Sequence, residues 1–205
     1  MNPISIGREW ASAWALMASY PLDCLTILQA RISRRSRQAH DAVLLIHGNG
    51  GDRSNLLAMS VLLRLSGFDN IGFFAYSARH AVEVSAAQLA EMAAQADGGA
   101  GVHFIGHSLG GTVARLAAAR SDKGRTRSSV TLGAPWWASQ HSPDEVAIFG
   151  RDDPIVAPPR GGTFPDGMFK RLIVLRNTGH LGVLHHDEAL RITLSELTAN
   201  RTAPR

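Results

Sequence analysis

The sequence predicts an α/β protein with a mostly parallel sheet of six strands and helices on both faces. From residue 42 onward, short apolar runs alternate with longer helical patterns. Parallel strands joined by crossover helices have this alternation. The first run, Ala42 to Ile46, is apolar throughout, as expected for a strand buried on both faces. The length of 205 residues fits one such domain and a short appendage.

The expected elements follow in chain order. We expect strands at 42–46, 71–76, 102–105, 130–132, 146–149 and 172–175, and helices at about 54–66, 81–96, 109–121 and 184–199. Together they predict one domain over residues 41–200. Reactive groups in open α/β sheets gather beyond the carboxyl ends of the strands. The loops that follow the strands are therefore where chemistry is expected.

Residues 1–40 are expected to form a separate helical appendage. Trp10, Trp14 and Met17 recur at helical spacing before Pro21 interrupts the pattern. The apolar stripe could pack on the domain or lie on a membrane surface as an interfacial helix. No apolar run is long enough to span a bilayer. The segment also lacks a basic start, so we interpret it as part of the mature protein.

The net charge of +4 allows several partners. Four arginines are clustered near the end of the appendage, Arg31, Arg34, Arg35 and Arg37. They could contact nucleic acid, contact an anionic membrane or form a solvated helix end. No aromatic residues lie between them, so we expect no nucleic-acid partner and keep peripheral membrane contact through residues 8–37 as an alternative. The single cysteine, Cys24, excludes an intramolecular disulfide and is expected to be a small buried residue. We expect a cytoplasmic protein, with peripheral membrane association and secretion left open.

The strongest chemical signal is a Gly-x-Ser-x-Gly motif formed by Gly106, Ser108 and Gly110. It follows the expected strand at 102–105 and precedes the helix expected from residue 109, which is the context of a nucleophile elbow. The glycines allow a sharp turn that exposes the serine hydroxyl. The amide of Leu109 would then point toward an oxyanion that forms on the substrate. This pattern predicts Ser108 as a nucleophile.

With this motif the chain resembles the α/β-hydrolase superfamily, and the resemblance extends over about residues 42–198. His47-Gly48-Asn49 resembles the His-Gly loop after the third strand of these hydrolases. The resemblance implies that the backbone amide of Asn49 is the second oxyanion donor, beside that of Leu109. His47 itself is expected to be structural.

The resemblance also implies the partners of the serine. Residues 150–156 resemble the acid loop Gly-x-x-Asp-x-x-Val, which assigns the orienting carboxylate to Asp153 and leaves Asp152 as the alternative. His180 follows the last expected strand, where the base belongs in the order Ser, Asp, His. His185 and His186 are the alternatives for the base. Their run with Asp187 and Glu188 is a poor metal cage, because adjacent helical residues point to different faces.

Two further stretches resemble bacterial lipases. Residues 131–135 resemble the Leu-Gly-x-Pro loop of triacylglycerol lipases, and residues 179–184 resemble the histidine loop of small lidless Bacillus-type lipases. After the proline the chain departs from the lipases with Trp136 and Trp137, which could line an acyl pocket as substrate-binding residues or pack beneath the loop. Only about ten residues separate Trp137 from the next strand, too few for a lid.

These features predict a serine esterase or lipase that works through an acyl-enzyme and needs no cofactor or metal. The expected substrate is a small-molecule or lipid ester with an apolar acyl chain. Three alternatives stay open: a thioesterase, acyltransferase or amidase with the same triad, a catalytically silent binding module of hydrolase fold, and a lipid esterase recruited to membranes through its N-terminal segment.

Overall fold

The computed structural model describes residues 41–51, 53–77, 80–96, 100–122, 124–138, 144–158 and 168–201. The predicted appendage over residues 1–40, with Cys24 and the arginine cluster, lies outside these residues. Among the described helices, none is both long and apolar enough to cross a membrane.

Six strands form one sheet with the order β2-β1-β3-β4-β5-β6, and every pair of neighbours is parallel. The strands are β1 (Ala42–Ile46), β2 (Ile71–Phe74), β3 (Val102–His107), β4 (Thr126–Leu132), β5 (Glu145–Gly150) and β6 (Arg171–Leu175). The predicted fold class is confirmed, and the sheet is wholly parallel.

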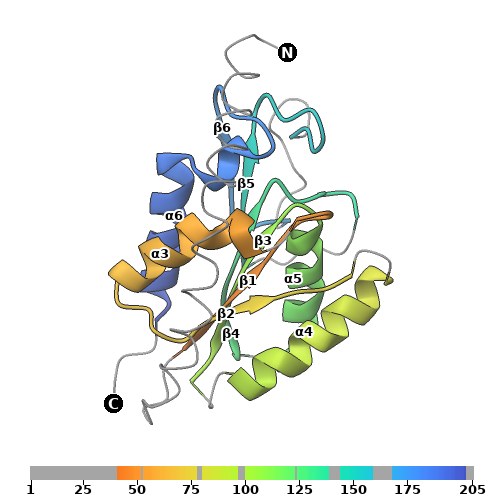
Figure 1. Cartoon of the computed structure of the whole chain (residues 1–205), viewed down its shortest axis with the longest axis vertical. Coiled ribbons are helices and arrows are strands. Elements are labelled where there is room, and N and C mark those ends of the chain that lie inside the picture. The colour runs from red at the N-terminus through yellow and green to blue at the C-terminus, as the bar shows by residue number, and fades with distance from the viewer. Residues whose placement is uncertain are drawn as a thin grey trace.

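Helices cover both faces of the sheet (Figure 1). On one face lie α3 (Leu57–Leu65), which follows the 3-10 turn η3 (Arg53–Leu56), and α6 (Asp187–Ala199), which follows η5 (Gly182–Leu184). On the other face lie α4 (Val82–Ala96) and α5 (Leu109–Arg120).

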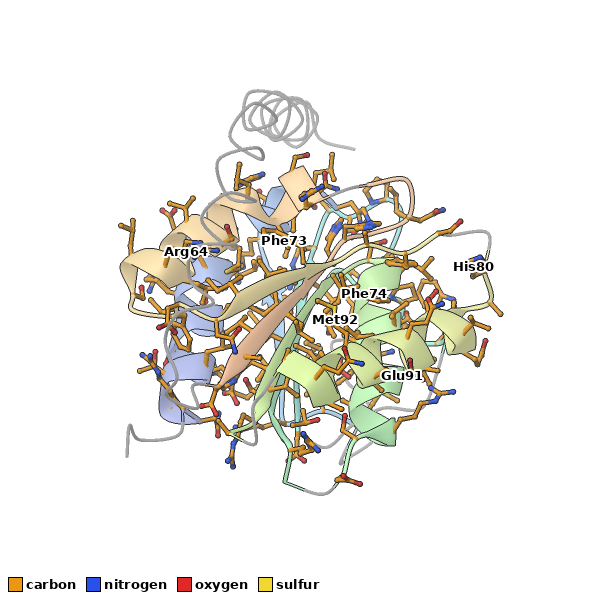
Figure 2. All side chains as sticks on the ribbon, turned by 60° about the horizontal axis from the view of Figure 1, so that its bottom comes forward. Arg64, Phe73, Phe74, His80, Glu91 and Met92 are labelled. Carbon is orange, nitrogen blue, oxygen red and sulfur yellow. The ribbon has the colours of Figure 1, made fainter. Side chains whose placement is uncertain are left out.

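Strand residues alternate between two apolar cores. Val43 and Leu45 of β1 pack in the core under α3 and α6, whereas Leu44 and Ile46 pack in the core under α4 and α5. On β2, Phe73 lies toward α3 and Phe74 lies toward α4 (Figure 2). This two-sided burial explains why the strand sequences are apolar without alternation.

The strand order changes direction at β1, which has β2 on one side and β3 on the other. The chain goes from β1 to β2 at the edge and then returns to β3. In open α/β sheets, ligands bind in the crevice beyond the carboxyl ends of strands at such a switch point. The loops after β1 and β3 carry His47 to Asn49 and Ser108, so the predicted reactive residues lie at this place.

Several predicted boundaries were wrong, and the strand expected to end at residue 105 continues to His107. The strand expected at 130–132 begins at Thr126, because Ser128 and Ser129 are buried although they are polar. The strand expected to reach residue 76 ends at Phe74. The last helix begins at Asp187 and not near 184, because residues 182–184 form the separate turn η5.

A buried ion pair ties α5 to two strands. The guanidinium of Arg115 donates to both carboxylate oxygens of Glu145, at 2.7 and 2.9 Å, and to the carbonyl of Pro135 at 3.1 Å. Thr131 donates to the same carboxylate at 2.6 Å. The Arg115 and Glu145 side chains are almost fully buried. Buried charges need such complete hydrogen bonding to be tolerated, so α5, β4 and β5 are held in fixed relation.

Candidate active site

Ser108 lies on a strained turn between β3 and α5. Its φ of 52° and ψ of −127° put it in a region that residues with a side chain rarely adopt. Among the described residues, only Asn177 shares a positive φ without being glycine. Such strain is found mainly at functional sites, where the surrounding structure holds it in place. The Ser108 amide donates to the carbonyl of Leu132 at 2.9 Å, which fixes the turn against β4.

Two glycines allow the close packing that this turn needs. A Cβ at Gly106 would lie 2.5 Å from the carbonyl oxygen of Gly110. A Cβ at Gly110 would collide with the carbonyl of His47 and would lie 2.6 Å from that of Ile46. The first turn of α5 is therefore packed directly on the end of β1, where no side chain fits.

The Ser108 hydroxyl is not used to cap α5. Ser108 occupies the N-cap position but makes no side-chain hydrogen bond to the first helical turn, and it is only partly buried. The amide of Leu109, the first residue of α5, has no acceptor within the helix. The positive end of the helix dipole therefore faces the region beside the hydroxyl.

Asp153 and His180 are joined by a short hydrogen bond. His180 Nδ1 lies 2.7 Å from Asp153 Oδ2, and both residues are buried, at 6% and 4% exposure. The other oxygen, Oδ1, accepts the amides of Ile155 and Val156 at 2.8 Å each. With Nδ1 donating to the carboxylate, the Nε2 atom of a neutral His180 is an acceptor.

The structure separates Asp153 from the alternative, Asp152. Asp152 is partly buried, and its amide donates to the carbonyl of Thr178 at 3.0 Å. This bond connects the loop after β5 to the loop after β6. Thr178 in turn donates from its hydroxyl to the carbonyl of Arg176 at 2.9 Å. Asp152 thus contributes through its backbone to the placement of His180, whereas Asp153 contacts the imidazole.

Ser108 is connected to this pair indirectly, through the adjacent residue His107. His107 Nε2 lies 3.1 Å from the carbonyl oxygen of His180, and the two rings are 4.8 Å apart at 47°. Among the described residues, no hydrogen bond joins the Ser108 hydroxyl to the His180 ring. The structure thus brings Asp153 and His180 into direct contact, and His107, the residue before Ser108, bonds to the backbone of His180.

The loop after β1 lies against the serine. A Cβ at Gly48 would be 3.0 Å from the Cβ of Ser108, and Asn49 follows on the exposed surface. His47 donates from Nδ1 to the carbonyl of Gly48 at 2.8 Å, which agrees with the structural role expected for it. The predicted oxyanion role of the Asn49 amide stays a prediction.

Tyr76 anchors this loop, and the sequence analysis missed it. Its hydroxyl donates to the carbonyl of His47 at 3.0 Å, and its ring stacks on that of His47 at 4.8 Å. Burial raises the pKa of Tyr76 to about 12, so the hydroxyl keeps its proton and remains a donor at neutral pH. The feature of the sequence that could have identified Tyr76 is its position just beyond the carboxyl end of β2.

The two tryptophans have different environments. Trp136 packs against the small core of Ala147, Phe149 and Val156 and donates from Nε1 to the carbonyl of Ala157 at 3.1 Å. Trp137 is 59% exposed and contacts the Trp136 ring edge to face at 5.5 Å. Trp136 therefore packs beneath the loop that carries Asp153, and Trp137 faces solvent at the same rim. Their predicted contact with substrate stays a prediction.

The histidines considered as alternatives have other positions. His186 accepts the amide of Glu188 at 3.2 Å and so caps the start of α6. Burial lowers the pKa of His185 below its ordinary value. Within the described ranges, no three His, Cys, Asp or Glu side chains gather as a metal site.

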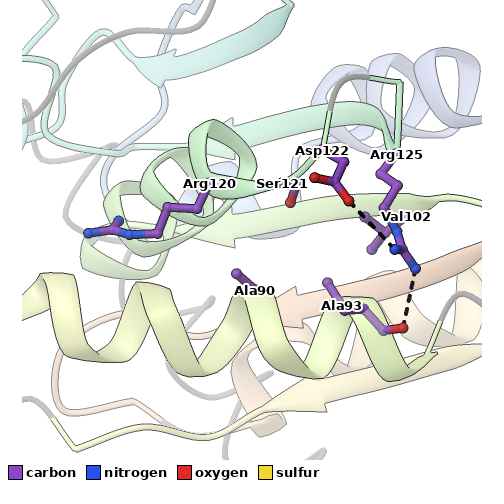
Figure 3. Close-up of a pocket in the computed structure, with 8 residues that line it drawn as sticks. Ala90, Ala93, Val102, Arg120, Ser121, Asp122 and Arg125 are labelled. Carbon is purple, nitrogen blue, oxygen red and sulfur yellow. Dashed lines mark hydrogen bonds and ion pairs between the residues drawn. The ribbon is translucent and has the colours of Figure 1, made fainter.

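A separate pocket lies at the opposite end of α5 from Ser108 (Figure 3). It has a volume of about 100 Å³ and is lined by alanines of α4 and by Arg120, Ser121 and Arg125. Arg125 donates to the carbonyl of Ala94 at 3.3 Å and lies 3.9 Å from Asp122. Ligand sites usually have roughly 300–1,000 Å³, so this pocket is too small to hold a substrate of that class.

Solved structures show the same fold. A protein from Xanthomonas campestris pv. campestris, described as a hydrolase of the alpha/beta superfamily, superposes with a TM-score of 0.61 at 16% identity, over 78% of this chain and 99% of that one. A serine hydrolase without a lid from Xanthomonas campestris superposes with 0.58 at 16% identity, over 83% and 88%. A thermophilic esterase from Thermogutta terrifontis superposes with 0.54 at 16% identity, over 76% and 87%.

No family model matches the sequence, and no curated protein matches it. At identities of 16%, the structural likeness concerns the fold. The chain has the fold of the α/β-hydrolase superfamily, which includes serine hydrolases without a lid.

Proposed function

We propose that this protein is a serine carboxylic-ester hydrolase, an esterase or lipase, that works through an acyl-enzyme. The observation that carries the proposal is the 2.7 Å hydrogen bond between His180 and Asp153 beside a serine on a strained, partly exposed turn. These are the three residue types of a catalytic triad, in the chain order of α/β-hydrolases. Solved structures with a similar fold are described as hydrolases and esterases, which supports the assignment to the hydrolase class.

In the first half of the reaction, Ser108 Oγ attacks the ester carbonyl carbon while His180 Nε2 accepts the hydroxyl proton. The carbonyl oxygen becomes an oxyanion, which the amides of Leu109 and Asn49 stabilise. When the tetrahedral intermediate collapses, the bond to the alcohol oxygen breaks. His180 gives its proton to that oxygen, and the acyl group stays on Ser108.

In the second half, water replaces the alcohol. His180 accepts a proton from water as its oxygen attacks the acyl carbon, and the same two amides hold the oxyanion. Collapse of this intermediate breaks the bond to Ser108, and His180 returns the proton to the serine oxygen. The carboxylic acid leaves, and no cofactor or metal takes part.

Asp153 makes His180 a base at its distal nitrogen. Because its carboxylate accepts from Nδ1, the neutral imidazole has its lone pair on Nε2. The carboxylate also stabilises the imidazolium that forms in both halves of the reaction. The two amides that bind Asp153 Oδ1 at 2.8 Å hold the carboxylate in this orientation.

The rim of the site favours an ester with an apolar acyl chain. Trp137 and Ile155 are large apolar residues with 59% and 65% exposure, and they lie on the loops after β4 and β5. The Trp136 contacts with Val156 and Ala157 connect these loops. Membrane contact through residues 8–37 and a cytoplasmic location remain predictions from the sequence.

The test combines a substrate panel with a covalent probe. We expect hydrolysis of p-nitrophenyl esters of graded acyl length, and labelling by a fluorophosphonate that mass spectrometry assigns to Ser108. The variant Ser108→Ala should lose both. Matched thioesters and amides, with and without an added alcohol acceptor, identify a thioesterase, amidase or acyltransferase if these reactions are faster. A folded protein that neither hydrolyses any of them nor reacts with the probe would be a silent binding module, and the proposal would be wrong.

A further inference from the structure

His107 is a buried imidazole that the proposed chemistry does not use. It is the last residue of β3, directly before Ser108, and it is only 2% exposed. Its ring lies 4.8 Å from the ring of His180. On its other side, a Cβ at Gly48 would be 3.0 Å from its Nδ1 atom. His107 therefore contacts the loop of the base, adjoins the serine and faces the loop after β1.

The hydrogen bond to His180 determines the tautomer of His107. Nε2 lies 3.1 Å from the carbonyl oxygen of His180, and a carbonyl can only accept. Nε2 must therefore carry a hydrogen. Burial, and after it the nearby His180, lower the pKa of His107 to about 3. The ring is thus neutral near pH 7, with its lone pair on Nδ1.

The Nδ1 acceptor is buried and has no hydrogen-bond partner among the described residues. An unpaired buried acceptor destabilises a fold, because it loses its hydrogen bonds to water without replacement. An apolar side chain of the same size would avoid this cost, so burial alone does not explain a histidine at this position. The bond from Nε2 to the His180 carbonyl is the one polar contact that His107 makes with the site.

We propose that His107 is a positioning residue, which holds the backbone of His180 beside Ser108 through its Nε2–H donor. This inference rests on the proposed function, because it concerns the geometry of the Ser108–His180 pair. Ser108 and His107 are adjacent in the chain, so a bond from His107 to His180 fixes the distance between nucleophile and base. No other described side chain bonds to the His180 carbonyl.

A neutral ring is also the form that the reaction needs here. His180 becomes positively charged each time it accepts a proton, and a second cation 4.8 Å away would oppose this step. The other charged or titratable groups that act on His107 are Asp153 and His185. A neutral imidazole supplies the hydrogen-bond donor that a lysine or arginine could supply, without the added charge.

The test compares two replacements of the same residue. His107→Gln keeps an N–H donor at about the position of Nε2, and His107→Leu keeps only the apolar volume. We expect His107→Leu to lower kcat by about 10- to 100-fold, because small displacements of reacting groups have effects of this size. KM should change less than threefold, and His107→Gln should recover most of kcat. His103→Gln, on the same strand but away from the site, is the matched control.

The outcomes separate this inference from the proposed function. If Ser108→Ala hydrolyses esters as well as the unchanged protein, the proposed function fails. If Ser108 is required but His107→Leu keeps kcat, or His107→Gln loses as much as His107→Leu, the role of His107 is wrong. Nitrogen NMR of the unchanged protein gives a test that needs no folded variant. We expect a neutral His107 with its hydrogen on Nε2 from pH 5 to 8, and a protonated ring or the Nδ1–H tautomer would overturn the inference.

Discussion

Two sets of serine, histidine and aspartate lie at opposite ends of the same sheet. The carboxyl end has Ser108, His180 and Asp153, and the amino end has Ser128, His103 and Asp41. At the amino end, Ser128 Oγ lies 2.7 Å from His103 Nδ1, and His103 Nε2 lies 3.6 Å from Asp41. A search by residue type and proximity would find both sets.

The backbone around each serine distinguishes them. Ser108 is on a strained turn, partly exposed, with the start of α5 beside it. Ser128 is inside strand β4 and only 1% exposed, and no helix begins there. His103 is fully buried. The turn, the partial exposure and the adjacent start of a helix thus distinguish Ser108, the proposed nucleophile, from Ser128, which is a polar part of the core.

The largest expected effect separates the two serines. Ser108→Ala should lower kcat for the best ester by on the order of a millionfold, since removing the nucleophile alone has effects of this size in other serine hydrolases. Ser128→Ala should leave kcat of the folded protein within a few-fold. Steady-state kinetics of both variants measures this. A large loss in Ser128→Ala without a loss of folding would contradict the distinction.

The second prediction tests the aspartates. Asp153→Asn should lower kcat by about 10,000-fold, because an amide can leave the imidazole in the wrong tautomer. Asp152→Asn is the matched control and should stay within a few-fold, since Asp152 contacts the base loop through its backbone amide. Equal losses in the two variants would contradict the assignment to Asp153. Thermal unfolding of each variant shows whether a loss of activity reflects a loss of fold.

The third prediction concerns the amino-end histidine. Burial lowers the pKa of His103 from 6.5 to about 4, against the opposing effect of Asp41. Between these pH values the unfolded chain binds a proton that the folded protein does not, so His103 makes the free energy of unfolding fall as the pH drops. The slope from this one group is about 1.4 kcal/mol per pH unit. Urea unfolding from pH 7 to 4.5 measures it.

His103→Asn should remove that part of the slope, and His80→Gln, at an exposed position, should not. His107 contributes in the same direction, because its pKa is also lowered, so some pH dependence remains in His103→Asn. An unchanged slope in His103→Asn would show that this ring is already protonated in the folded protein at acidic pH.

The smallest effects are expected for substitutions of the two tryptophans, which lie beyond the carboxyl ends of the strands. Trp137→Ala should change the free energy of unfolding by less than about 0.5 kcal/mol, because Trp137 is largely exposed. It should raise KM a few-fold for long acyl chains and leave short esters unchanged. Trp136→Ala should instead lower the free energy of unfolding by about 1–2 kcal/mol, because apolar burial is lost. Equal KM values for all chain lengths would exclude Trp137 from acyl binding.

The sheet and the glycine-rich turn at Ser108 could be predicted from the sequence for a clear physical reason. Strands buried on both faces are continuous apolar runs, and the turn at Ser108 requires glycines that are visible in the chain. Polar residues that become buried gave no such signal. The first half of β4 was missed because Ser128 bonds to His103 from another strand, and this partner is distant in the sequence.

The contacts that hold the site residues in place could not be predicted from the sequence either, because the partners are distant along the chain. Arg115 looks like a surface residue in the sequence, because charged side chains are rarely fully buried without a partner, and its partner Glu145 lies 30 residues away. Tyr76 and His107 act on the carbonyls of His47 and His180. Every residue has a backbone carbonyl, so the sequence does not show which carbonyl accepts a hydrogen bond. Only the folded structure identifies these contacts.

The Arg115–Glu145 pair has a consequence for how the molecule is assembled. A chain in which α5 has docked before β5 would contain a guanidinium that has lost water and has no counter-charge. Removing one partner of a buried pair typically destabilises a protein by about 3–5 kcal/mol, so such a partly assembled form is strongly disfavoured. We therefore expect the helix that begins beside Ser108 and the strand that leads to Asp153 to become ordered as one cooperative unit, so that these two residues enter the native state together.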